Sequence, residues 1–246
     1  MPATSTLDLR LGPMAGRRTA IVAGATGLVG SQLLPLLLDS GRYARAVALA
    51  RRTLPLASPL LEARPAAFDR LAELLADTGG ATTDVFCCLG TTIGKAGSEA
   101  AFRQVDYDFP LALARWAAAT GARRFLVVSA LGADAASRIF YNRVKGELEA
   151  ALGRAGLASL VLLRPSLLAG ARKEFRLGER LTLAATAPLR WLLPAGVRPV
   201  QAADVAAAMV EAAESASPPP VVTSSEMQGA YLRLTGRSAA AMAGKA

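Results

Sequence analysis

A tyrosine and a lysine stand four residues apart in the stretch IFYNRVKGELEAAL, as Tyr141 and Lys145. Four residues make about one helical turn, so both side chains would lie on one face. A free tyrosine, with a pKa of about 10, exchanges protons slowly at neutral pH, but a neighbouring ammonium stabilises its phenolate. The pair could move a proton, although a helix surface that carries both residues by chance is the open alternative. The pair borders a predicted buried stripe of Phe140, Val144, Leu148 and Ala151.

Buried strands and helices must position this pair. The run RRFLVVSA predicts a strand that ends at Ser129, and ASLVLLRPS predicts a strand after the helix. Upstream, RTAIVAG, ARAVALAR, EARPAAFD and TDVFCCLG predict four strands separated by helical segments, and PPVVTSSEMQGAYLRL contains a last one. Apolar runs that alternate with helices predict an α/β fold, with a parallel sheet covered on both faces.

The composition restricts the chemistry of the 246-residue chain. Hydrophobic residues make up 52% and charged residues 19%, which excludes a disordered protein. Histidine is absent, and the two cysteines, Cys87 and Cys88, are adjacent. A Ser-His triad, a His-ligated metal, a zinc site and a disulfide framework are therefore excluded, and we expect no metal.

The net charge of +9 comes mostly from scattered arginines, without a basic tract, so we expect no nucleic-acid partner. No apolar run has the length or continuity of a spanning helix or a signal peptide, so we expect no membrane association. We expect a cytoplasmic protein. The basic composition suits anionic small molecules.

The stretch GATGLVG places Gly24, Gly27 and Gly30 between a predicted strand and a predicted helix. Gly24 permits a sharp turn, Gly27 lets the backbone approach a pyrophosphate, and Gly30 lets the helix pack against the strand. The helix N-terminus adds free N–H groups and a positive dipole. This pattern predicts dinucleotide binding.

The second strand indicates which dinucleotide is bound. It ends VALARR, with Arg51 and Arg52 where an NAD enzyme usually has a carboxylate for the adenosine ribose. Arginine can hold a 2′-phosphate through charge-assisted hydrogen bonds, whereas a carboxylate would repel it. We expect NADP(H) in preference to NAD(H), with a solvated basic turn as the alternative.

The motifs GATGLVG, FCCLGTT, FLVVSA, YNRVKGELE and LVLLRPSLL occur together in this order. The chain thereby resembles the atypical and extended short-chain dehydrogenase/reductases, in particular the Tat-interacting-protein-like oxidoreductases and their bacterial relatives. The likeness covers roughly residues 18–235, and FCCLGTTIGKAGSEAAFRQVDYDFP carries it most specifically. It implies a doubly wound Rossmann-type parallel sheet, a small C-terminal substrate cap, NADPH binding and a Ser/Tyr/Lys active site.

The resemblance assigns roles residue by residue. The catalytic positions are Ser129, Tyr141 and Lys145. The cofactor-binding positions are Gly24, Thr26, Gly27, Leu28, Val29, Gly30, Arg51, Arg52, Leu89, Gly90, Tyr141, Lys145 and Pro165, with Ser166 beside the last. Tyr141 would transfer a proton, Lys145 would hold the nicotinamide ribose, and Ser129 would orient the substrate oxygen.

One departure concerns the proton supply to this site. Many short-chain dehydrogenases anchor a relay water with an asparagine, and its counterpart here is Asp106. The sequence therefore leaves a full proton relay open.

We expect a flexible N-terminal extension over 1–17, a single NAD(P)-binding domain over 18–236 and a flexible tail over 237–246. Cap elements would lie around 166–200. The function expected from the residues and the resemblance is reduction of a small carbonyl compound. A non-catalytic NADP(H)-binding regulator that associates with a protein partner is the alternative, and the oligomeric state is left open.

Overall fold

The structure is a computed structural model that describes residues 17–169 and 198–243, with side chains described up to residue 236. The N-terminal extension expected over 1–17 lies outside the described residues apart from its last residue. Most of the cap expected around 166–200 also lies outside them. In the described ranges, no helix has the length and apolar character that crossing a membrane requires.

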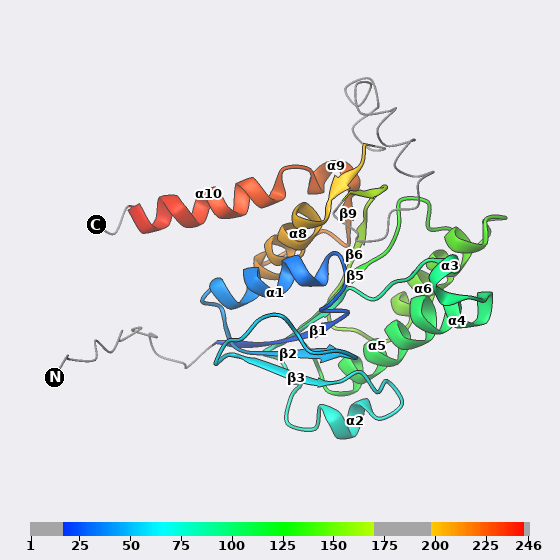
Figure 1. The fold of residues 1–246 in the computed structure, drawn as a ribbon, viewed down its shortest axis with the longest axis horizontal. Coiled ribbons are helices and arrows are strands. Elements are labelled where there is room, and N and C mark those ends of the chain that lie inside the picture. Colours follow the sequence, from blue (N-terminus) through cyan, green and yellow to red (C-terminus); the bar gives the residue numbers. More distant parts are fainter. Residues whose placement is uncertain (1–16, 170–197, 244–246) are drawn as a thin grey trace.

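Seven parallel strands form one sheet in the order β3-β2-β1-β4-β5-β6-β9 (Figure 1). Their bounds are β1 Arg18–Ala23, β2 Tyr43–Ala50, β3 Leu61–Pro65, β4 Thr83–Cys87, β5 Arg124–Val128, β6 Leu160–Arg164 and β9 Val221–Thr223. A separate pair joins β7 (Leu168–Ala169) to β8 (Val200–Gln201). The Rossmann-type parallel sheet predicted from the sequence is confirmed.

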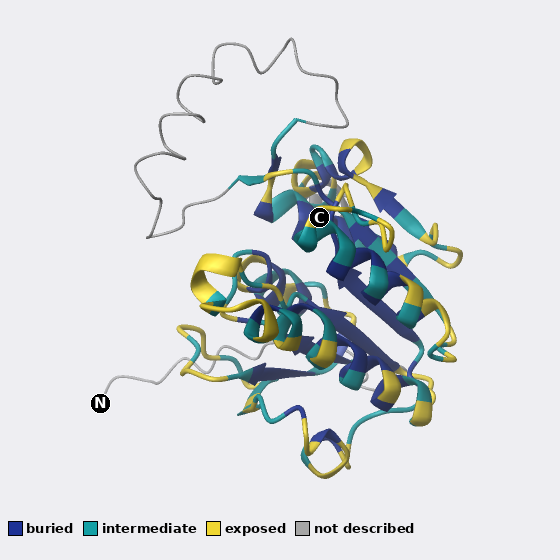
Figure 2. Cartoon of the chain, turned by 90° about the vertical axis from the view of Figure 1, so that its right-hand side faces the viewer, coloured by how far each residue is buried: buried dark blue, intermediate teal, exposed yellow. Residues whose placement is uncertain are grey.

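Helices cover both faces of the sheet (Figure 1). On one face lie α1 (Gly30–Asp39), α8 (Ala202–Glu214), α9 (Ser224–Met227) and α10 (Ala230–Ala243). On the other lie α2 (Leu71–Leu74), α3 (Ile93–Ala96), α4 (Glu99–Arg103), α5 (Phe109–Ala119) and α6 (Phe140–Gly153). Successive strand residues alternate between two cores: Val22 packs with α1 and α8, and Ile21 packs with α5 and α6. Figure 2 shows these buried layers on both sides of the strands.

The long helix predicted over SEAAFRQVDYDFPLALARWAAATG is not regular. A π-helical turn, η1 (Gln104–Asp108), separates α4 from α5. Pro110 has no N–H to give to the carbonyl of Asp106 four residues earlier, so an ordinary α-helical bond cannot form there. A wider π turn accommodates the proline, and such turns are frequent at functional sites.

The last helix runs into the segment for which the sequence predicts a tail. Helix α10 continues to Ala243, beyond residue 236, where the sequence predicted a flexible tail to begin.

The turn between β1 and α1 is packed too closely for side chains at two of its glycines. Gly24 has a φ of +82°, and a Cβ there would lie 2.5 Å from the carbonyl oxygen of Cys88. A Cβ on Gly30 would lie 2.2 Å from the carbonyl oxygen of Gly24. The two glycines therefore bring α1, β1 and the end of β4 into direct backbone contact.

This packing predicts opposite effects for two glycine-to-alanine substitutions in helices. Gly30→Ala should lower the free energy of unfolding by about 1–3 kcal/mol, because the added methyl group meets backbone. Gly153→Ala, at the end of α6, should raise it by up to about 1 kcal/mol, because nothing lies within 4 Å of the new Cβ. Urea unfolding measures the change in the free energy of unfolding for each variant. Equal changes in the two variants would refute the close packing at Gly30.

Candidate active site

The strand ends bring the predicted site residues to one edge of the sheet. In parallel strands all carboxyl ends meet at the same edge, and open α/β sheets bind ligands there. The glycine turn follows β1, Arg51 follows β2, Gly90 lies beyond β4, Ser129 follows β5 and Pro165 follows β6. Since β1, β4, β5 and β6 are neighbours in the sheet, their following residues form a continuous border.

The glycine turn has the features of an anion cradle. The N–H of Gly27 donates to the carbonyl of Gly24 at 2.9 Å and closes the turn, while Thr26 is exposed. Leu28 packs against the core, and Val29 is the N-cap residue of α1 and makes no side-chain capping hydrogen bond. The N–H groups of Ser31, Gln32 and Leu33 donate to the carbonyls of Gly27 and Val29, and no described side chain caps this end of α1. The positive end of the helix dipole suits a phosphate.

The remaining predicted cofactor residues lie along the same border. Arg51 and Arg52 are both exposed directly after β2. Leu89 packs against the core on the α5 side, and Gly90 beside it is exposed. Pro165 is buried, and its carbonyl accepts the N–H of Leu131 at 2.9 Å, which joins the segments after β5 and β6. The described residues thus fit a dinucleotide laid across the border.

Helix α6 places Tyr141 and Lys145 one turn apart, in the helix that follows Ser129 and β5. The ring of Tyr141 lies 5.7 Å from the ring of Phe102 in α4 and is partly exposed. The sequence placed Lys145 at the border of the buried stripe, but its side chain is only 4% exposed. Burial of a lysine requires a compensating charge.

Asp106 supplies that charge. Its Oδ1 lies 2.8 Å from Nζ of Lys145, and its own side chain is 1% exposed. Its Oδ2 accepts the backbone N–H of Thr91 at 2.8 Å. Nζ of Lys145 also donates to the carbonyl of Val128 at 3.5 Å.

These contacts determine the charge state of Lys145. Burial by itself would lower its pKa, but Asp106 and Tyr141 outweigh burial and raise the pKa above its ordinary value. Lys145 is therefore charged at neutral pH. Because the folded pKa of Lys145 exceeds the unfolded one, its protonation stabilises the fold at neutral pH, and this contribution is lost as the pH rises above about 10.

Ser129 makes a contact that the sequence analysis missed. Its hydroxyl donates to Oε1 of Glu149, and Glu149 also accepts two hydrogen bonds from the guanidinium of Arg164 in β6. Ser129 and Glu149 are both buried. The signal was present in YNRVKGELE, where Glu149 follows Lys145 by the same four residues that separate Lys145 from Tyr141.

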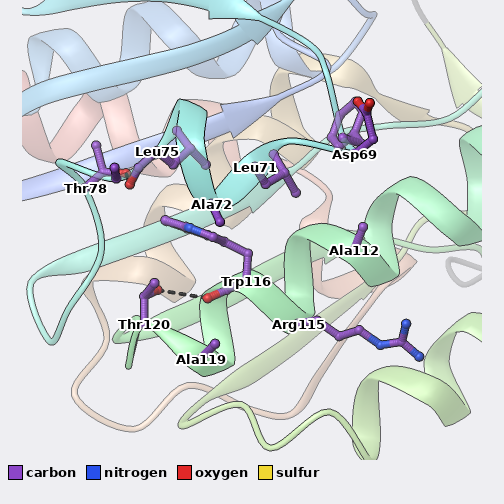
Figure 3. Close-up of a pocket in the computed structure, with 12 residues that line it drawn as sticks. Asp69, Leu71, Ala72, Leu75, Thr78, Ala112, Arg115, Trp116, Ala119 and Thr120 are labelled. Atoms are coloured by element: carbon purple, nitrogen blue, oxygen red, sulfur yellow. Dashed lines mark hydrogen bonds between the residues drawn. The ribbon is translucent and has the colours of Figure 1, made fainter.

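A pocket of about 610 Å³ lies away from these residues, between α2 and α5 (Figure 3). Trp116, Leu71 and Leu75 contribute apolar walls, and Asp69 lies near one end. None of the predicted catalytic residues lines it. The pocket therefore does not belong to the arrangement around Lys145.

Comparison with known proteins identifies relatives. The family model described as HIM1 matches residues 73–189. The mitochondrial protein FMP52 of Coccidioides immitis is 35% identical over 172 residues, 65% of this chain and 70% of that protein. FMP52 of Candida albicans is 31% identical over 202 residues, 80% of this chain and 88% of that protein. Protein HTATIP2 of Rattus norvegicus is 34% identical over 167 residues, 67% of this chain and 68% of that protein.

Solved structures agree on the fold. MoeE5 in complex with UDP-glucuronic acid and NAD aligns with a TM-score of 0.63 at 18% identity, over 89% of this chain and 82% of that chain. The Bordetella bronchiseptica enzyme WbmH in complex with NAD+ aligns with a TM-score of 0.62 at 15% identity, over 82% of this chain and 74% of that chain. An oxidoreductase of the short-chain dehydrogenase/reductase family from Burkholderia thailandensis aligns with a TM-score of 0.56 at 18% identity, over 81% of this chain and 86% of that chain.

The comparisons correct one expectation and confirm another. The cytoplasmic location expected from the sequence is contradicted, because the FMP52 relatives from Coccidioides immitis, Candida albicans and Emericella nidulans are named mitochondrial. The resemblance to Tat-interacting-protein-like members of the atypical short-chain dehydrogenases is confirmed. The chain has the fold of NAD-binding short-chain dehydrogenase-type enzymes, and it belongs to the HIM1/FMP52 family, to which HTATIP2 is related.

Proposed function

We propose that the chain is an NADPH-dependent reductase of carbonyl compounds. One observation supports this proposal most strongly: a buried, charged Lys145 lies one turn from Tyr141 on α6, at the sheet edge that also carries the glycine turn. Chance would place a tyrosine and a lysine at this spacing on many helices. A buried counter-ion for the lysine, at the sheet edge that carries the glycine turn, is not expected by chance.

The cofactor would be held by backbone and arginine groups. The first turn of α1 would receive the pyrophosphate, and Arg51 with Arg52 would receive the 2′-phosphate of NADPH. Lys145 would hold the ribose next to the nicotinamide, and Leu89, Gly90 and Pro165 would border it. When bound, the reduced nicotinamide supplies a hydride to the carbonyl carbon of the substrate.

The chain itself must supply the proton. Tyr141 donates its phenolic proton to the substrate oxygen as negative charge develops there. The ammonium of Lys145 stabilises the phenolate that remains. Ser129 orients the substrate oxygen, and its hydroxyl must leave Glu149 in order to donate to a carbonyl.

The contact between Ser129 and Glu149 favours a second candidate function. While Glu149 accepts the only hydroxyl proton, Ser129 can offer a ligand no more than an acceptor oxygen. A regulator that binds NADP(H) without turnover, and associates with a protein partner, would tolerate this arrangement. Tight NADPH binding without turnover on any substrate would favour it over the reductase.

The reductase proposal predicts a selective effect of Tyr141→Phe. Turnover should fall by about 10²–10⁴-fold, because the proton donor is lost, while NADPH affinity should fall by no more than about tenfold, the loss of one hydrogen bond. NADPH oxidation is followed at 340 nm with a panel of aldehydes and ketones. Tyr231→Phe, at an exposed position of α10, is the matched control and should not change turnover. A Tyr141→Phe variant as active as the wild type would refute the assignment.

The cofactor preference gives a separate prediction. Arg51→Ala combined with Arg52→Ala should weaken NADPH binding by about 10–100-fold, because charge-assisted hydrogen bonds to the 2′-phosphate are lost. NADH, which lacks this phosphate, should bind the variant and the wild type about equally. Calorimetric titrations measure the affinity of the wild type and of the double variant for each cofactor. Tighter binding of NADH than NADPH by the wild type would show that the arginines do not select the cofactor.

A further inference from the structure

The resemblance to short-chain dehydrogenases implies an asparagine that anchors a water at the position of Asp106. The structure has a different arrangement here, because Asp106 contacts the lysine directly, with 2.8 Å between Oδ1 and Nζ. The π-helical turn η1 carries Asp106, which is the buried residue of that turn. This contact joins η1 to α6 without an intervening water.

Among the groups of the described residues that face the ammonium, Asp106 is the charged partner of Lys145. From β4, Cys87 faces it as a neutral thiol, because burial raises the pKa of that thiol to about 11. From β5, the carbonyl of Val128 accepts a hydrogen bond. From α6 itself, Tyr141 contributes an electrostatic interaction. The charge of the buried ammonium therefore depends on Asp106.

The second oxygen of Asp106 holds a different element. Oδ2 accepts the backbone N–H of Thr91, in the segment that follows β4 and contains Leu89 and Gly90. A single buried carboxylate thus ties the segment after β4 to the lysine of α6. Both lie at the sheet edge where the cofactor would bind.

We propose that Asp106 is a positioning residue of the cofactor site, which fixes the Lys145 ammonium against the segment after β4 and keeps it charged. This inference rests on the proposed function, because it assumes that Lys145 meets NADP(H). The preformed pair has no net charge, but it would hold a protonated ammonium ready to donate hydrogen bonds to the cofactor at every pH from neutral to about 10. An asparagine at this position would leave the ammonium buried without a counter-charge.

Asp106→Asn tests the proposal, with Asp108→Asn as the matched control, since Asp108 lies exposed in the same π turn. The chain contains four lysines, so the titration of Lys145 can be followed by NMR of its side-chain signals and assigned with Lys145→Arg. NADPH affinity is measured in parallel at about pH 7 and about pH 9.5. The pH dependence separates a charge effect from a merely structural one.

In Asp106→Asn, the pKa of Lys145 should fall below its wild-type value, because burial is no longer opposed by a carboxylate. NADPH affinity should then fall by about fivefold between the two pH values, as the ammonium loses its proton. The NADPH affinities of the wild type and of Asp108→Asn should change by less than about twofold between the same two pH values. If Asp106→Asn does not fold, the wild-type titration decides: a Lys145 pKa above about 10.4 supports the proposal, and a lower one overturns it.

Two failures remain distinguishable. An Asp106→Asn variant with the wild-type lysine titration and the wild-type pH dependence of NADPH binding would overturn the role of Asp106 alone. A wild type that binds neither NADPH nor NADH would overturn the proposed function, and with it the placement of this ion pair in a cofactor site.

Discussion

The arrangement at the carboxyl edge depends on one buried ion pair, between Lys145 and Asp106. Either charge alone would be expensive to remove from water, by several kcal/mol, so the two must be buried together. The pair requires η1, α6 and the segment after β4 to meet at one place. The regular elements bring these segments near one another, and the ion pair then determines how they contact.

Helix α6 organises the rest of the edge through a row of polar residues spaced by four. Tyr141, Lys145 and Glu149 follow one another along it, and the last two are bonded to different partners. Gly146 lets the helix approach the chain after β5, since a Cβ there would lie 2.2 Å from the backbone nitrogen of Ala135. The glycine that follows Lys145 therefore permits the close approach of this helix to the segment after Ser129.

Local patterns were sufficient to predict the sheet and the glycine turn. Mostly apolar runs of five to eight residues marked β1, β2, β4, β5 and β6, because a strand covered on both faces needs no polar alternation. The contacts of Asp106 and Glu149 were not predictable in this way. They join residues distant in the chain, and they depend on strand order and on a π turn that the helical pattern does not indicate. The buried state of Lys145 was missed for the same reason, since its counter-ion lies on another helix.

A crystal structure with bound NADP+ tests the central claim most directly. We predict the pyrophosphate at the glycine turn, the 2′-phosphate beside Arg51 and Arg52, and a nicotinamide ribose hydroxyl within hydrogen-bond distance of Nζ of Lys145. Tyr141 and Ser129 should then border the nicotinamide. Cofactor found elsewhere, such as in the pocket between α2 and α5, or no cofactor at millimolar concentration, would contradict the account.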